Sequence, residues 1–112
     1  METLIQQLRE FAKERDWEQF HSPKNLAMAL SVEVAEIVEV FQWLTEDQSR
    51  ELDGKKLEKV REEIGDVMIF LTNLADKLGI DPLVAAKEKI KENRRKYPVN
   101  IVKGKAHKYT EY

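Results

Sequence analysis

The segment spanning residues 26–44 constrains the fold most, because it is nearly all apolar and yet carries Glu33 and Glu36. A helix that is apolar over most of its surface is buried against other elements. A carboxylate buried along with it needs a bound cation, a basic side chain or a wet cleft, because an unpaired charge in an apolar interior costs several kcal/mol. The segment therefore predicts a packed helix that carries a polar site.

A second pair of carboxylates, Glu63 and Asp66, has the same spacing on a later amphipathic segment. Residues three apart are neighbours on one helix face, so each pair can present its oxygens to one ion. Two pairs facing each other across a bundle would hold divalent ions, and oxygen-only ligands favour Mg²⁺ or Mn²⁺. The alternative is that these are ordinary exposed helix carboxylates. It is the better interpretation for Glu63 and Asp66 taken alone, whereas the apolar surroundings of Glu33 and Glu36 make it less favourable for that pair.

Gly65 lies between Glu63 and Asp66, inside the same predicted helix. Glycine in a helix interior costs about 1 kcal/mol relative to alanine. We therefore expect a feature that requires a missing side chain there, such as close helix packing.

Apolar periodicity and cap signals predict an all-α fold, a four-helix bundle without strands. Ser22 before Pro23, and Asp81 before Pro82, each place an N-cap ahead of a proline at the first helical position. The helices are expected over residues 4–16, 23–44, 57–78 and 82–97, with Thr3 capping the first and Gly79 ending the third. Residues 99–112 are expected to be an irregular tail.

The size of the chain predicts a single domain, 1–112, because 112 residues with 42% hydrophobic content build one core. The absence of cysteine excludes a disulfide framework and a thiolate zinc site. The N-terminus is unlike a signal peptide and no apolar stretch is long enough to span a membrane. We therefore expect a soluble cytoplasmic protein without a membrane partner.

The net charge of -2 is unevenly distributed, since residues 87–108 hold nine Lys or Arg against two Glu. A site that binds a polyanion through a metal ion would use this basic stretch together with the carboxylates upstream. The alternative is a solvated helix face. Nucleic acid is not an expected partner, because a pI of about 5.8 gives no general attraction for a phosphate backbone.

Aromatic residues extend the faces that carry the carboxylates. Trp43 follows Glu36 by seven residues, about 10 Å along a helix, which suits a stacked base whose phosphates reach a metal ion. Phe70 follows Asp66 by one turn, and Trp17 and His21 are one turn apart if the chain is helical there. Taken singly, Trp43 and Phe70 are more often core residues and His21 a loop residue.

The predicted fourth helix carries Lys89, Asn93 and Tyr97 at successive turns. Such a row of donors can hold phosphate or sugar oxygens. The alternative is the solvated edge of an amphipathic helix, which for Lys89 alone is the better interpretation.

Four segments together resemble the dCTP pyrophosphatase branch of the MazG-like, all-α nucleoside triphosphate pyrophosphohydrolases. They are RDWEQFHSPKNLAMAL, EVAEIVEVFQW, EEIGDVMIF and KENRRKYPVNIVKGKAHKYTEY, and they span nearly the whole chain. Broader members of the family carry EExxE followed by ExxD. Here Val32 occupies the first acidic position and leaves Glu33 and Glu36, as in the dCTP-preferring branch.

The resemblance implies a fold, an activity and a set of site residues. Glu33, Glu36, Glu63 and Asp66 would bind Mg²⁺ and carry catalysis. Phe70 stands where the branch has a tyrosine. The family cleaves nucleoside triphosphates between the α- and β-phosphates and works as homodimers or homotetramers with sites at subunit interfaces. The positions that match its substrate pocket are Trp17, His21, Trp43, Phe70, Lys89, Asn93 and Tyr97.

The residues alone are compatible with this chemistry, because no Ser-His, Cys-His or lysine arrangement indicates a covalent nucleophile, which leaves a metal-activated water. The first hypothesis is therefore a Mg²⁺-dependent pyrophosphohydrolase that removes dCTP or a modified dCTP from the nucleotide pool. A second hypothesis is the same reaction on another nucleotide such as dUTP. A third is a helical interaction module without catalysis.

Overall fold

The computed structural model describes residues 1–104, and within that range the chain is all-α. The chain divides into two compact units, Met1–Ile80 and a second unit that begins at Asp81. No strand occurs among residues 1–104, so the predicted all-α class is confirmed. Within the same range, no helix is both long enough and apolar enough to cross a membrane.

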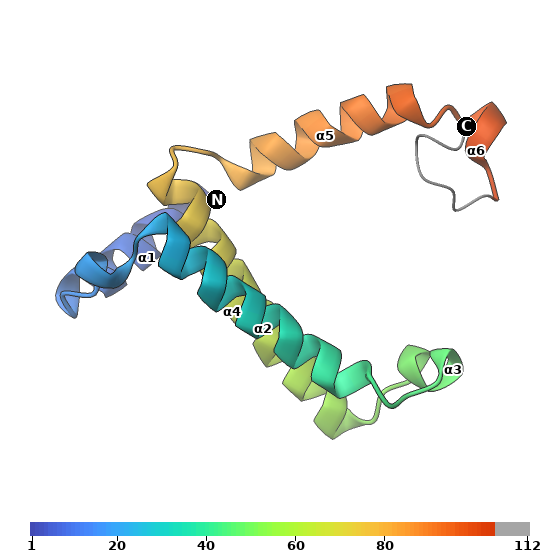
Figure 1. The fold of residues 1–112 in the computed structure, drawn as a ribbon, viewed down its shortest axis with the longest axis horizontal. Coiled ribbons are helices and arrows are strands. Elements are labelled where there is room, and N and C mark those ends of the chain that lie inside the picture. The colour runs from blue at the N-terminus through green and yellow to red at the C-terminus, as the bar shows by residue number, and fades with distance from the viewer. Residues whose placement is uncertain (105–112) are drawn as a thin grey trace. The chain divides into compact units, whose positions relative to one another are not determined.

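The first unit is built on two long helices, α2 (Pro23–Phe41) and α4 (Gly54–Lys77), which pack side by side and run in opposite directions (Figure 1). Helix α1 (Glu2–Glu14) packs against α4. The buried apolar core draws on all three helices and consists of Ala12, Leu26, Val60 and Ala75. The α2–α4 pair is therefore the frame on which any site in this unit is placed.

An ion pair joins α1 to α4. The Arg9 guanidinium donates to both carboxylate oxygens of Asp76, at 2.8 and 2.6 Å. These hydrogen bonds lower the pKa of Asp76 below its ordinary value. A bidentate guanidinium–carboxylate pair fixes orientation as well as distance, so it sets how α1 lies on α4.

The predicted caps of two helices are confirmed. Ser22 Oγ accepts a hydrogen bond from the Asn25 backbone N–H at the start of α2. Asp81 Oδ1 accepts from the backbone N–H groups of Leu83 and Val84 at the start of α5 (Pro82–Lys96). Gly79, at φ +68°, follows the end of α4 in the left-handed region that glycine adopts without strain.

Other boundaries differ from the sequence predictions. Helix α1 begins at Glu2 with Met1 as its N-cap, so Thr3 lies inside the helix and is not its cap. Helix α2 ends at Phe41, before Trp43. The expected linker contains α3 (Glu46–Arg50), where Thr45 and Gln48 form a reciprocal capping box, and a short 3₁₀ helix, η1 (Glu18–Phe20), precedes α2. The tail expected to be irregular opens with α6 (Val99–Val102), and its remainder from residue 105 lies outside the described residues.

Helix α2 is less buried than its composition predicts. Leu26 is its one fully buried residue, whereas Met28, Val32 and Val38 are exposed. Gly65 on α4 is exposed too, and a Cβ added there would meet nothing within 4 Å, so the close packing expected at this glycine is absent from the described chain. The first unit therefore leaves apolar surface on α2 and α4 that its own helices do not cover.

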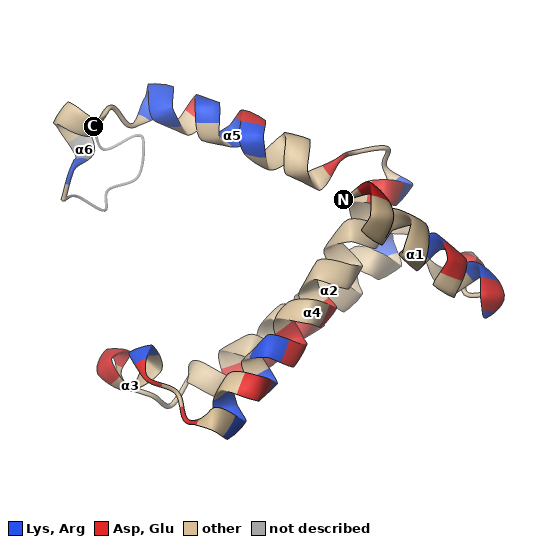
Figure 2. Ribbon diagram, turned by 180° about the vertical axis from the view of Figure 1, so that it is seen from behind, with Lys and Arg blue, Asp and Glu red and all other residues tan. Residues whose placement is uncertain are grey.

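The helices differ in how many charged residues they carry (Figure 2). The α2 ribbon is mostly uncharged, whereas the N-terminal half of α4 alternates acidic and basic residues. Helix α5 carries much of the basic stretch, and there Glu92 pairs with Lys89 at 3.2 Å and with Lys96 at 2.7 Å. Part of the basic charge on α5 is thus neutralised within its own helix.

Candidate functional site

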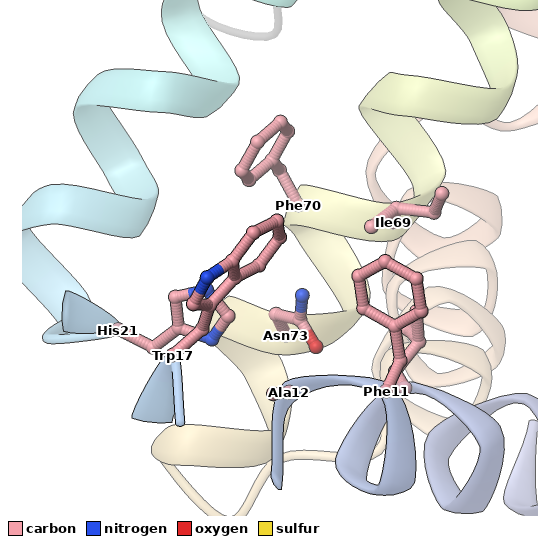
Figure 3. Close-up of a pocket in the computed structure, with 8 residues that line it drawn as sticks. Phe11, Ala12, Trp17, His21, Ile69, Phe70 and Asn73 are labelled. Atoms are coloured by element: carbon pink, nitrogen blue, oxygen red, sulfur yellow. The ribbon is translucent and has the colours of Figure 1, made fainter. Parts of the chain in front are cut away.

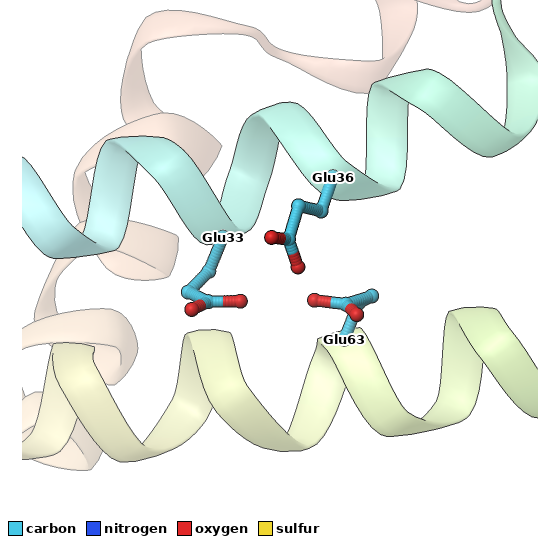
Figure 4. A group of neighbouring side chains, drawn as sticks. All are labelled: Glu33, Glu36 and Glu63. Carbon is cyan, nitrogen blue, oxygen red and sulfur yellow. The ribbon is translucent and has the colours of Figure 1, made fainter.

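Three carboxylates meet between α2 and α4. Glu33 and Glu36 lie one turn apart on α2, and Glu63 lies on the facing side of α4 (Figure 4). One carboxylate oxygen from each side chain lies within 4.8 Å of the others. We call these three residues the acidic cluster. Among residues 1–104 it is the group whose side chains could together bind a metal ion, and its members come from both of the predicted carboxylate pairs.

The cluster is largely removed from water. Glu63 is 3% exposed, and Glu33 and Glu36 are half-buried. Burial, together with a hydrogen bond shared with Glu63, raises the pKa of Glu33 to about 7. The pKa of Glu36 is raised as well, first by its hydrogen bond with Glu63 and then by burial. Carboxyl groups brought together in this way share protons because their negative charges repel.

Glu63 differs from the other two because a lysine neutralises it. The Lys59 ammonium lies 2.8 Å from Glu63 Oε1 and, by this hydrogen bond, lowers the pKa of Glu63. The ion pair therefore favours the ionised form of Glu63.

Two oxygens of the cluster have unmet coordination. Glu33 Oε2 and Glu63 Oε2 are buried and have no hydrogen-bond partner. Buried polar atoms are nearly always satisfied, so an unsatisfied pair in one cluster indicates a missing partner. Three carboxylates without sulfur or imidazole are the ligands of a hard divalent cation. The residues present therefore fit a divalent metal ion.

Asp66, the fourth predicted ligand, is not part of the three-residue group. It is half-buried, one turn beyond Glu63 on α4. Its negative charge nevertheless contributes to the raised pKa of Glu33, so it acts on the same cluster. Its role as a ligand stays a prediction.

A cavity of about 160 Å³ lies between α1, η1 and α4, and it brings together three of the predicted pocket residues, Trp17, His21 and Phe70 (Figure 3). Phe11 meets Trp17 edge to face, with ring centroids 5.6 Å apart. Asn73, one turn beyond Phe70, adds an amide to the wall. We call this space the aromatic cavity; its walls are apolar except for His21 and Asn73.

Trp43 lies elsewhere. It is 86% exposed and lines a different cavity, of about 430 Å³, together with Lys55, Lys56 and Lys59. Trp17 precedes α2 and Trp43 follows it, and the 19 residues of α2 span about 28 Å. Within one chain, the two tryptophans therefore cannot contact the same base.

The remaining predicted pocket residues, Lys89, Asn93 and Tyr97, lie on α5 or at its C-cap, in the second unit. Lys89 is paired with Glu92. Their assignment to a substrate pocket stays a prediction.

Sequence reasoning missed Lys59 and Asn73. Lys59 precedes Glu63 by one turn, a spacing that places it beside that carboxylate, so a search for basic partners of the buried carboxylates would have found it. Asn73 follows Phe70 by three residues, but its relevance depends on α1 packing against α4, which no local pattern shows.

Comparison with known proteins identifies related sequences over most of the chain. The MazG-like family matches residues 28–112. The protein named dCTP pyrophosphatase 1 is 43% identical in its Homo sapiens form and 45% identical in its Mus musculus form, each over 104 residues. Each of these matches covers 91% of this chain and 61% of the relative, so the chain spans about three fifths of their length.

A solved structure confirms the fold. The crystal structure of a pyrophosphatase from Archaeoglobus fulgidus matches with a TM-score of 0.82 and 46% sequence identity, over 88% of this chain and 92% of that one. The all-α architecture and the resemblance noted from the sequence are both confirmed by these matches.

The raised pKa of Glu33 makes a prediction about stability without metal. Folding raises the pKa of Glu33 from 4.5 to about 7, so the folded state holds this proton more tightly than the unfolded chain does. The contribution of Glu33 to stability is therefore full below 4.5 and falls as the pH rises to about 7. Glu33→Gln cannot ionise, so in EDTA its melting temperature should gain on that of the wild type across this window. Thermal melts at closely spaced pH values test this, and a gap that does not change with pH contradicts it.

Proposed function

This chain belongs to the MazG-like family, and we propose that it is a Mg²⁺-dependent nucleoside triphosphate pyrophosphohydrolase that converts dCTP or a modified dCTP to the monophosphate and pyrophosphate. The family match and the relatives named dCTP pyrophosphatase 1 support the reaction. The observation that carries the proposal is the acidic cluster, with its buried and unsatisfied oxygens on Glu33 and Glu63. We propose that residues 1–112 act as one domain on the cytoplasmic nucleotide pool.

The cluster suits this reaction because phosphoryl transfer depends on charge neutralisation and positioning. Glu33, Glu36 and Glu63, with Asp66 one turn away, would hold Mg²⁺ or Mn²⁺, which neutralises the triphosphate and lowers the pKa of a bound water. The two helices hold the carboxylates in place before the ion arrives, so little reorganisation is needed. Lys89 and Asn93 on α5, and Tyr97 at its C-cap, are proposed to bind phosphate or sugar oxygens.

Product analysis tests this function. Purified protein incubated with dCTP and Mg²⁺ should release dCMP and pyrophosphate, and Glu36→Gln should reduce turnover by roughly a hundredfold or more, because it removes charge from the metal site while keeping the shape of the side chain. Glu39→Gln, an exposed neighbour on the same helix, is the matched control and should keep its activity.

The outcomes separate the alternatives. Release of dCDP and phosphate would contradict the bond assignment. Faster hydrolysis of another nucleotide such as dUTP would favour the same reaction on a different base. If no deoxynucleoside triphosphate yields a product, the remaining hypothesis is a helical interaction module without catalysis.

The aromatic cavity is the proposed site for the base. It offers apolar walls for stacking and two polar groups, His21 and Asn73, for the edge of a base. Such a site tolerates any base on its faces and discriminates at its edge, because an unpaired polar group in a closed pocket is costly.

Kinetics on variants test this placement. Trp17→Ala should raise KM for dCTP and dUTP to a similar degree, by roughly fivefold to a hundredfold if stacking contributes about 1–3 kcal/mol. Asn73→Ala should instead change the ratio of kcat/KM between dCTP and dUTP. Circular dichroism verifies that each variant is folded. Equal KM values for Trp17→Ala and wild type would place the base elsewhere.

We further propose that the protein works as a homodimer or homotetramer whose site is shared between copies. The exposed apolar residues of α2 and α4 support this, since uncovered apolar surface of this extent marks an interface. A second copy also offers a route by which Trp43 can reach a nucleotide bound at the aromatic cavity of its partner.

Sedimentation equilibrium at low micromolar concentration tests the assembly and should give two or four times the 13.1 kDa chain mass. Met28→Glu, which places a charge on the exposed apolar face of α2, should shift the protein toward monomer. Lys24→Glu, at an exposed polar position of the same helix, is the control. An active monomer would refute the shared site.

A further inference from the structure

Lys59 stands out among the charged residues of the first unit because it reaches into the acidic cluster. Its Nζ lies 2.8 Å from Glu63 Oε1, and its side chain is 53% exposed while that of Glu63 is 4% exposed. Within residues 1–104, it is the basic side chain that forms an ion pair with a member of the cluster. The ammonium thus enters a buried carboxylate site from the solvent side.

The ion pair is not explained by helix stability. A lysine four residues before a glutamate is the less favourable order on a helix, and exposed pairs at this spacing contribute little. Burial of the carboxylate changes the balance, because removing the partner of a buried charge leaves that charge uncompensated. The role of Lys59 is therefore charge compensation for Glu63.

We propose that Lys59 is a resident cation of the acidic cluster, which neutralises Glu63 in the absence of a divalent ion and opposes the binding of such an ion at the other oxygen of Glu63. This inference rests on the metal site of the proposed function and adds a regulating residue to it.

The ammonium and a divalent ion would share one carboxylate, because Lys59 Nζ bonds Glu63 Oε1 and Glu63 Oε2 is the oxygen left without a partner. An ion held by Oε2, at about 2.1 Å for Mg²⁺, would face the ammonium across that carboxylate. Their repulsion is strong in a site with little water, so the ammonium opposes the binding of the ion. The protein therefore binds the metal ion less tightly than its carboxylates alone would allow.

Lys59 also has room to move away. Its exposed stem lines the cavity beside Trp43, which has a volume of about 430 Å³ and is shared with Lys55 and Lys56. Lys56 is held by Asp53, with Nζ 3.1 Å from Oδ2, so it stays at the start of α4. A lysine repelled from Glu63 can therefore swing into this open cavity, which also holds the carboxylates of Glu39 and Asp53.

Calorimetric titration of the full chain with Mg²⁺ and with Mn²⁺ tests the proposal. Lys59→Met should bind Mg²⁺ roughly tenfold more tightly than wild type, because no ammonium repels the ion across the Glu63 carboxylate. The metal-free variant should also melt at a lower temperature than the metal-free wild type, and saturating Mg²⁺ should close that gap.

Two further variants make the result specific. Lys55→Met removes a positive charge from the same cavity without touching the cluster, so it measures the general electrostatic effect and should change Mg²⁺ affinity much less. Lys59→Arg keeps the charge and can bond a carboxylate with two donors, so it should weaken Mg²⁺ binding.

The possible outcomes separate this inference from the proposed function. Wild type that binds Mg²⁺ while Lys59→Met binds no more tightly than Lys55→Met would overturn the resident cation alone. Wild type that binds neither Mg²⁺ nor Mn²⁺ would overturn the metal site as well. Opposite shifts for Lys59→Met and Lys59→Arg would support the proposal even if one variant is less stable.

Discussion

The mutual repulsion of three carboxylates held between α2 and α4 is the constraint on which the first unit depends. Glu33, Glu36 and Glu63 are brought within 4.8 Å by the same helix packing that forms the core. The protein accommodates them by sharing protons on α2 and by an ion pair on α4. Stability and chemical function are thus opposed at one place, since the arrangement that would bind a divalent ion is unfavourable without a cation.

The two long helices also place the cluster between two different environments. Toward the start of α2 lies the aromatic cavity, which is small and mostly apolar, and beyond its end lies a larger cavity lined by Trp43 and lysines. Glu63 and Phe70 are seven residues apart on α4, about 10 Å along the axis. A nucleotide whose phosphates lie at the cluster would therefore have a stacking site within reach and, on the other side, a cavity lined by three lysines together with Glu39 and Asp53.

Local chemistry explains how much the sequence could predict. Ser22 and Asp81 can be identified as caps because a cap depends on a few neighbouring residues. Glu33, Glu36 and Glu63 can be identified as candidate metal ligands because their spacing along the helices fixes the faces on which they lie. Features that depend on packing can be predicted less well. The resemblance assigns Trp17 and Trp43 to a substrate pocket, and this assignment stays a prediction. Because the length of α2 separates the two side chains within one chain, a common pocket would need a second copy. Helix α2 is also more exposed than its apolar composition predicts, because the burial of a helix depends on which neighbouring elements cover it.

The Arg9–Asp76 pair has a consequence for the aromatic cavity. Leu8 and Phe11 on α1 form one wall of that cavity and Asn73 on α4 another, and the Arg9–Asp76 pair links the same two helices. Arg9 is more than half exposed, and charge pairs open to solvent weaken as ionic strength rises. We therefore expect high salt to loosen the packing of α1 on α4 and, with it, the fit of a planar ring between these walls.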